Sequence, residues 1–122
     1  MSPLVRYMKA WVANDPSQIA AAVATECTIA ECYGPVYSGR DRVRQWAETW
    51  LAAGGIVHGW TITDQFASGS REAAQWEFEC TWGGNRSRFE GATVSRSSEG
   101  LIVELREFQT TAALYDWHGE WR

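Results

Sequence analysis

The chain has 122 residues, 45% of them hydrophobic, which is enough for one domain with its own core over residues 1–122. Eleven Lys and Arg against fifteen Asp and Glu give a net charge of −4, which argues against nucleic-acid binding, and no apolar stretch approaches the roughly 18 residues that span a membrane. Three cysteines, an odd number, fit free thiols in a reducing cytoplasm better than a disulfide framework, so we expect a cytoplasmic protein.

The first third of the chain is predicted to be mainly helical. Apolar residues recur at helical spacing from Leu4 to Val12, and Asp15 followed by Pro16 is typical of the start of a second helix. Gly54-Gly55 is a typical helix end. The elements expected are a helix over residues 3–13, a short helix with its body at Ile19–Ala24, a strand over Thr28–Tyr33, and a helix that opens at Ser38–Asp41 and runs through Leu51.

The second half is predicted to consist of strands only. Alternating apolar residues separated by Gly- and Ser-rich turns indicate four long antiparallel strands. Together with the helices they predict an α+β architecture in two layers. The strands expected are Ile56–Phe66, Ala73–Trp82, Arg86–Ser97 and Leu101–Gln109.

The turns between these strands predict which side chains share a face. A two-residue Gly-Gly turn places Phe78 opposite Phe89, and the following three-residue turn places Ala92 opposite Arg106. A bulge is expected to turn Asp64 outward, away from Trp60, Ile62 and Phe66. One face then carries the charged residues Glu77, Glu79, Arg88, Glu90, Glu104 and Arg106. The other, expected under the helices, carries Trp76, Phe78, Cys80, Phe89, Thr93, Val103, Leu105 and Glu107.

Several kinds of chemistry have no motif in this sequence. The only two histidines, His58 and His118, have no second ligand at metal spacing, so we expect neither a metal nor a cofactor. The sequence contains no GxSxG nucleophile elbow, and no Gly-rich loop precedes a helix. Eight Trp residues indicate a wide apolar surface or cavity. Acid–base chemistry or ligand binding in an aromatic pocket remains.

Two residues are candidates for that chemistry. Glu31 is expected on a strand beside Ile29 and Tyr33, where desolvation would raise its pKa and suit it to act as a general base. Glu31 could instead accept hydrogen bonds from Tyr7, a strand-end amide or Arg40. Tyr7, one helical turn before Trp11, could donate to a developing oxyanion or be a core aromatic residue.

Three further residues are open to two interpretations. Glu107 shares the inner face with Val103 and Leu105, so it is either a pocket residue or the structural partner of His58 or an Arg. Trp60 and Trp76 belong either to the core or to the lining of a pocket.

Several short motifs of this sequence occur together in the order of a known family: Arg6-Tyr7, Asn14-Asp15, Ile19, Thr28-Ile29-Ala30-Glu31, Gly34 and Gly39, and more loosely Ser38–Asp41 and Glu99–Arg106. These motifs resemble those of the bacterial ketosteroid isomerases, which belong to the nuclear transport factor 2-like, or SnoaL-like, superfamily. The resemblance implies a curved antiparallel sheet forming a cone, with the N-terminal helices packed over it (a cystatin-like α+β barrel), and a homodimer.

The resemblance also implies roles for particular residues. Tyr7 falls where the isomerases have their oxyanion tyrosine, and Glu31 where they have the aspartate that shuttles the proton. The isomerases' third group, a buried protonated Asp, falls at about Thr93 or Ala92, neither of which is an acid.

The function expected is therefore removal of a proton next to a carbonyl in a small apolar molecule, without a cofactor. The alternative is a non-catalytic ligand-binding or dimerisation module with the same pocket. In either case, the residues predicted to contact the ligand, besides Glu31 and Tyr7, are Trp11, Tyr33, Trp60, Trp76, Thr93 and Glu107.

Overall fold

The computed structural model describes all 122 residues and places three helices in the first half of the chain. α1 (Pro3–Val12) begins after Ser2, whose side chain accepts a hydrogen bond from a backbone N–H of the first turn. α2 (Pro16–Ala21) begins after Asp15, whose carboxylate accepts from two backbone N–H groups. α3 spans Arg40–Ala52. The predicted positions of the first and third helices are confirmed to within one or two residues.

The second helix is shorter than its sequence predicts. Its body was expected to reach Ala24, but α2 ends at Ala21 and the chain enters a strand at Val23. Val23 pairs with Ile102, a residue almost 80 positions further along the chain. Pairing with a distant strand therefore overrides the helical preference of the alanine-rich segment.

One six-stranded sheet forms the second layer, in the order β2-β1-β6-β5-β4-β3. β1 and β6 run parallel, and every other neighbouring pair is antiparallel. The three-residue strand β2 was not predicted. The strands are β1 (Val23–Ala30), β2 (Val36–Ser38), β3 (Ile56–Ser68), β4 (Arg71–Trp82), β5 (Asn85–Ser98) and β6 (Leu101–Gln109).

The two predicted hairpin registers have different outcomes. Phe78 lies opposite Phe89, as predicted from the two-residue turn. The register of the next hairpin was predicted wrongly, because Arg106 lies opposite Val94 rather than Ala92. A bulge near the turn accounts for part of this difference. From Glu104 on, the shift is two residues and the side chains stay on their predicted faces, since side chains alternate with a period of two. Ile102, on the other side of the bulge, does not follow this alternation and is buried in the core.

The predicted faces are confirmed for β4, β5 and β6. All eight side chains expected under the helices are buried or partly buried. On the outer face, Arg88 and Glu77 form one of several cross-strand ion pairs. In β3 a bulge turns Asp64 outward, as predicted, but it also carries Phe66 to the outer face, where this side chain is 69% exposed. The expectation that Phe66 shares a face with Trp60 is therefore wrong.

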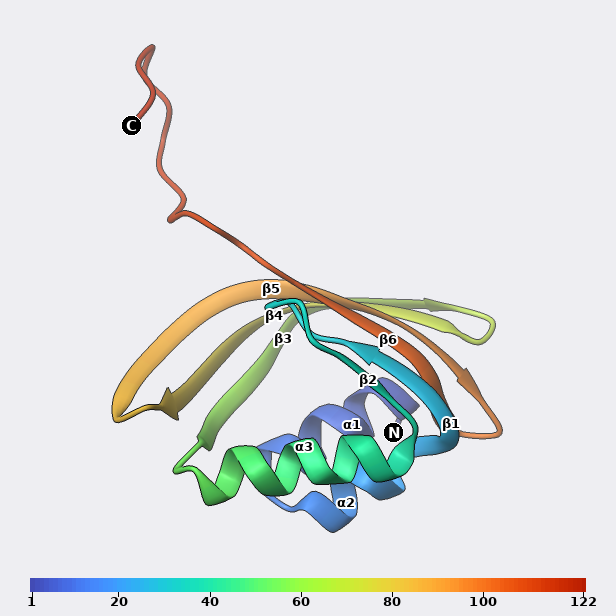
Figure 1. The fold of residues 1–122 in the computed structure, drawn as a ribbon. Coiled ribbons are helices and arrows are strands. Elements are labelled where there is room, and N and C mark those ends of the chain that lie inside the picture. The colour runs from blue at the N-terminus through green and yellow to red at the C-terminus, as the bar shows by residue number, and fades with distance from the viewer.

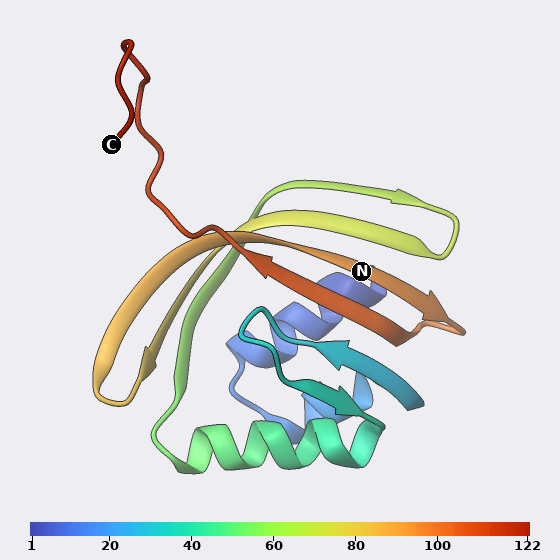
Figure 2. The same ribbon diagram turned by 45° about the horizontal axis from the view of Figure 1, so that its top comes forward.

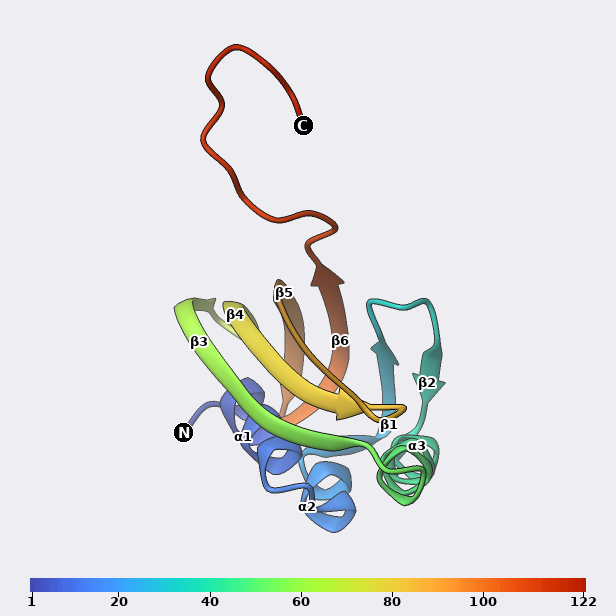
Figure 3. The same cartoon turned by 90° about the vertical axis from the view of Figure 1, so that its left-hand side faces the viewer.

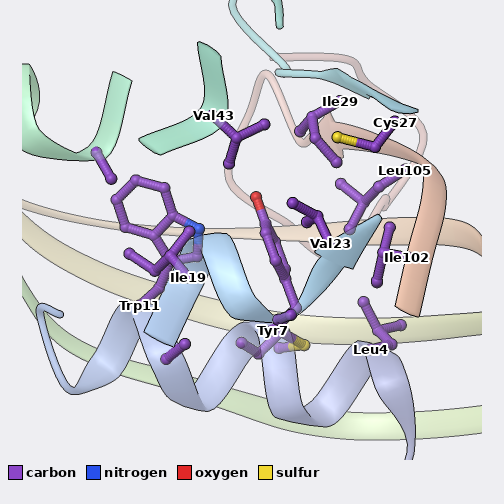
Figure 4. Close-up of a cluster of buried hydrophobic side chains, with 14 of the residues drawn as sticks. Leu4, Tyr7, Trp11, Ile19, Val23, Cys27, Ile29, Val43, Ile102 and Leu105 are labelled. Carbon is purple, nitrogen blue, oxygen red and sulfur yellow. The ribbon is translucent and has the colours of Figure 1, made fainter. Parts of the chain in front are cut away.

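The sheet is strongly curved and arches over the helices (Figures 1 and 2). Seventeen buried residues, from all three helices and from the strands β1, β3, β4 and β6, form the core, part of which is shown in Figure 4. After β6, residues 110–122 have no regular structure and extend away from the sheet (Figure 3). None of the helices is long and apolar enough to cross a membrane.

Candidate functional site

A cavity of about 850 Å³ lies within the concave side of the sheet, bounded by α1, α3 and the turn after β1. Seven of the eight side chains predicted for the site line this one cavity: Tyr7, Trp11, Glu31, Tyr33, Trp60, Trp76 and Glu107.

Glu31 lies just beyond the end of β1 rather than within a strand. The backbone N–H of Glu31 donates to the carbonyl of Pro35, and its own carbonyl accepts from Gly34, which places Glu31 at the start of the turn. The hydroxyl of Tyr37 donates to Glu31 Oε1 at 3.1 Å. Burial raises the pKa of Glu31, and this hydrogen bond partly offsets the rise.

Tyr37 was not singled out in the sequence. The donors considered for Glu31 were Tyr7, a strand-end amide and Arg40, but Arg40 instead donates to the carbonyl of Val23. Tyr37 lies in β2, a strand too short to leave a recognisable pattern. Its pairing with β1 brings Tyr37 opposite Ile29, two residues from Glu31.

Glu107 is a pocket residue, and the alternative of a structural ion pair is wrong. His58, one proposed partner, forms its hydrogen bond with Thr81 instead, and no Arg is paired with Glu107. Burial raises the pKa of Glu107 to about 8, and the negative charge of Glu31 adds to this rise. At neutral pH, Glu107 is therefore mostly a neutral carboxylic acid that can donate a hydrogen bond.

Tyr7 projects from α1 into the interior, with its hydroxyl directed away from the helix (Figure 4). The side chain is fully buried, and its hydroxyl has no hydrogen-bond partner. Burial, followed by the charge of Glu107, raises the pKa of Tyr7 well above its ordinary value. The phenol therefore keeps its proton and presents a free donor, a costly arrangement in an interior unless a ligand completes it.

Thr93 is the one predicted site residue that does not line the cavity. It is fully buried, and its hydroxyl accepts a hydrogen bond from Trp76 Nε1 at 2.8 Å. Thr93 therefore fixes the orientation of a wall residue from behind. Glu107 lies directly opposite Thr93 on the neighbouring strand.

The walls of the cavity are almost entirely aromatic. Two of the lining side chains, Trp46 and Trp50, come from α3. Trp46 stacks on Tyr37 with ring centroids 4.0 Å apart, and Trp50 stacks on Trp82 with ring centroids 5.7 Å apart. The α3 residues were predicted only as an apolar helix face. At the rim, Tyr33 is 64% exposed, with its ring edge against Phe89.

The site combines three acidic groups whose pKa values burial raises to different extents. Burial raises the pKa of Glu107 to about 8, that of Glu31 by less, and that of Tyr7 well above its ordinary value, and groups that differ in this way can divide the roles of base and hydrogen-bond donor. No three His, Cys, Asp or Glu side chains lie close enough together to hold a metal ion.

Comparison with known families gives one match, in which residues 4–105 match the SnoaL-like domain. No curated protein matches the sequence significantly.

Several solved structures share the fold at low sequence identity. A Catenulispora acidiphila protein with a ketosteroid isomerase-like fold, in complex with trimethylamine, is 18% identical; the match covers 89% of this chain and 85% of that one, with a TM-score of 0.79. An epoxide hydrolase of the LEH-like type from M. tuberculosis is 15% identical, over 88% and 80%, with a TM-score of 0.79. A candidate polyketide cyclase from Pseudomonas putida is 16% identical, over 91% and 93%, with a TM-score of 0.74.

Proposed function

Because this chain belongs to the SnoaL-like domain family, we propose that its cavity binds a small carbonyl compound and that Glu31 removes a proton from the carbon next to the carbonyl. One observation carries this proposal: two carboxyl groups share the cavity, beside a tyrosine hydroxyl without a partner, and burial raises the pKa of Glu107 far more than that of Glu31. Environments that separate two acids in this way commonly assign one as base and the other as hydrogen-bond donor.

Glu31 acts as the base in this mechanism. Its carboxylate takes the proton, and the electron pair of the broken C–H bond moves into the carbonyl to form an enolate. The proton is then returned to the same carbon or, where a C=C bond is conjugated with the enolate, to the far carbon of that bond, so the reaction needs no cofactor. The hydrogen bond from Tyr37 holds the carboxylate in place, and partial burial raises its pKa, which makes Glu31 a stronger base.

Tyr7 and Glu107 act as the donors to the enolate oxygen. Both keep their protons at neutral pH because burial disfavours their charged forms. Losing one such donor typically lowers the rate about 10²–10³-fold. Glu107 thereby takes the part that the resemblance to the isomerases assigns to an acid near Thr93.

The relatives support a small-molecule site in this fold. The Catenulispora protein holds trimethylamine, and the other two similar structures are an epoxide hydrolase and a candidate cyclase. These different functions are compatible with one fold in which the polar groups of the pocket differ from protein to protein.

Deuterium uptake by a test ketone measures the proposed step directly. 2-Tetralone in D₂O is expected to exchange its protons next to the carbonyl faster when the protein is present, as followed by NMR. Glu31→Gln is expected to lower this rate about 10²–10⁴-fold because it removes the base. Glu26→Gln, which removes an exposed acid from β1, is the matched control and keeps the rate.

Binding of 2-naphthol, an enolate mimic, separates the two functions considered. Exchange that persists in Glu31→Gln contradicts the mechanism. If 2-naphthol binds and quenches Trp fluorescence but no ketone exchanges, the protein is a binding module, and the affinity should then depend on Trp60 rather than on Glu31.

A further inference from the structure

We propose that the molecule held in this cavity carries a positively charged alkylammonium group, seated between the aromatic walls and the carboxyl pair. This inference names the substrate class for the proposed function. It rests on the proposed function only because both use the same cavity. Three features of the cavity carry it: the type of its apolar residues, its unbalanced charge and its unpartnered polar atoms.

The apolar lining is aromatic to an unusual degree. Of the fourteen hydrophobic residues at the cavity, eleven are Trp, Tyr or Phe, two are Cys, and Val57 is the only aliphatic one. A neutral hydrocarbon would be held equally well by Leu, Ile or Val, which make ordinary core contacts. Aromatic faces add a quadrupole that attracts cations, most strongly in Trp, and they are the usual walls of sites for quaternary ammonium groups.

The charge of the cavity is also unbalanced. Glu31 and Glu107 both face the interior, whereas the only cationic side chain in the lining is Arg42, which is exposed on α3 and donates to Gln45. No ion pair involves either carboxyl group. A buried carboxylate without a counter-ion is costly, and a cationic ligand would supply that counter-ion.

At one point of the cavity, the carboxylate of Glu31 lies next to the aromatic side chains. Tyr37 donates to Glu31 through its hydroxyl and stacks on Trp46 through its ring. Trp11 packs against the same Trp46, with ring centroids 4.7 Å apart. An ammonium group near Glu31 would therefore have a negative charge on one side and indole faces on another.

Tyr7 supplies an observation independent of the acids. Tyr7 is among the residues that line the cavity, and its fully buried hydroxyl donates to no group of the protein. A substrate with a carbonyl oxygen and an ammonium group would use this donor together with the carboxylate of Glu31.

A cation in this position changes the protonation of the carboxyl pair. It favours the charged form of Glu107, whose proton is held by burial and by the charge of Glu31. The other titratable groups that line the cavity are Tyr7, Cys32, Tyr33, Tyr37, Cys80 and Arg42. Burial raises the pKa of Tyr7, Cys32, Tyr33 and Tyr37, so these groups keep their protons and the release of a proton on binding reports on the acids.

Two phenols of equal shape test the inference. 3-(Trimethylammonio)phenol and 3-tert-butylphenol differ by one positive charge, and both hydroxyls are neutral at about pH 6.5. We expect the charged phenol to bind roughly tenfold more tightly by calorimetry, as cation–π and charge contacts predict. Comparing two buffers of different ionisation enthalpy should also show proton release for the charged phenol only.

Variants identify the source of the preference. Glu31→Gln should reduce it several-fold, and the double variant Glu31→Gln/Glu107→Gln should abolish it. Glu26→Gln, with the same change in net charge outside the cavity, should keep it. Trp82→Leu, at a half-exposed wall position, should lower the preference while affinity for the neutral phenol changes little.

The outcomes distinguish this inference from the proposed function. If the neutral phenol binds as well as the charged one, the cation inference is overturned and the acid–base site stands. If neither phenol binds, the oxyanion site fails, and benzyltrimethylammonium, which has no hydroxyl, decides the cation inference alone: binding supports it and no binding overturns it.

Discussion

Replacing Glu107 with Gln should make the protein more stable, by an amount that grows with pH. The pKa of Glu107 is raised from 4.5 to about 8 in the folded protein. Below pH 4.5, Glu107 is protonated in the folded and unfolded chain alike. Between these pKa values the unfolded chain releases the proton while the folded protein keeps it, so the free energy of unfolding falls as pH rises and levels off above about pH 8.

The magnitude follows from the separation of the two pKa values. Each pH unit between them corresponds to about 1.4 kcal/mol, so the wild-type protein loses up to about 4–5 kcal/mol of stability by pH 8 through this one group. Gln has nearly the same shape and no proton to lose. The variant should therefore match the wild-type protein near pH 4.5 and exceed it by several kcal/mol at pH 8.

Urea unfolding followed by Trp fluorescence from about pH 4.5 to 8.5 measures this difference. Glu104→Gln removes an acid from an exposed position of the same strand, where its ion pair with Arg96 is worth little, and serves as the control. A difference between Glu107→Gln and the wild-type protein that stays constant with pH would refute the reasoning, because it would mean that Glu107 is charged in the folded protein.

Three further changes test the frame around the site, each by thermal or urea unfolding. Gly91→Ala should destabilise the protein by more than about 2 kcal/mol, because an added methyl group would overlap the ring of Trp76 and the backbone of β6. Asn14→Ala should cost about 2–3 kcal/mol, since the Asn14 side chain bonds to both the N–H and the carbonyl of Val57. Glu72→Ala should cost about 1–3 kcal/mol, because buried Glu72 accepts a hydrogen bond from the first turn of α1. Surface substitutions usually change the free energy of unfolding by less than about 0.5 kcal/mol. A variant of these three that loses less than this amount would contradict the contact on which its prediction rests.

The two hairpins explain which parts of the fold could be predicted from the sequence. The turn at Gly83-Gly84 needs positive φ angles at both positions, which Gly adopts freely, so its register could be predicted. The turn between β5 and β6 is also a two-residue turn, but one of its residues is Glu99, at φ 52°. A Glu is rarely found in this conformation, so a three-residue turn was expected and the register was wrong.

The aromatic part of the site was less predictable than its acids. The alternation of β6 placed Glu107 on the inner face, and the resemblance marked Glu31 and Tyr7. Trp46 could be assigned only to the buried side of a helix, because helical periodicity shows which face is apolar but not whether it meets the core or a cavity. Tyr37 depends on a three-residue strand and gave no signal.

The position of Glu107 depends on the pairing of strands and could not be found by aligning the sequence with the isomerase motifs alone. Counting places the isomerases' buried acid at about Thr93, where this chain has a hydroxyl that accepts from the indole of Trp76. Residues directly opposite on neighbouring strands share a face at short range, and the residue opposite Thr93 is Glu107. The neighbouring strand thus brings a carboxyl group to the cavity beside Thr93, a proximity that depends on strand pairing and is not visible in the linear sequence.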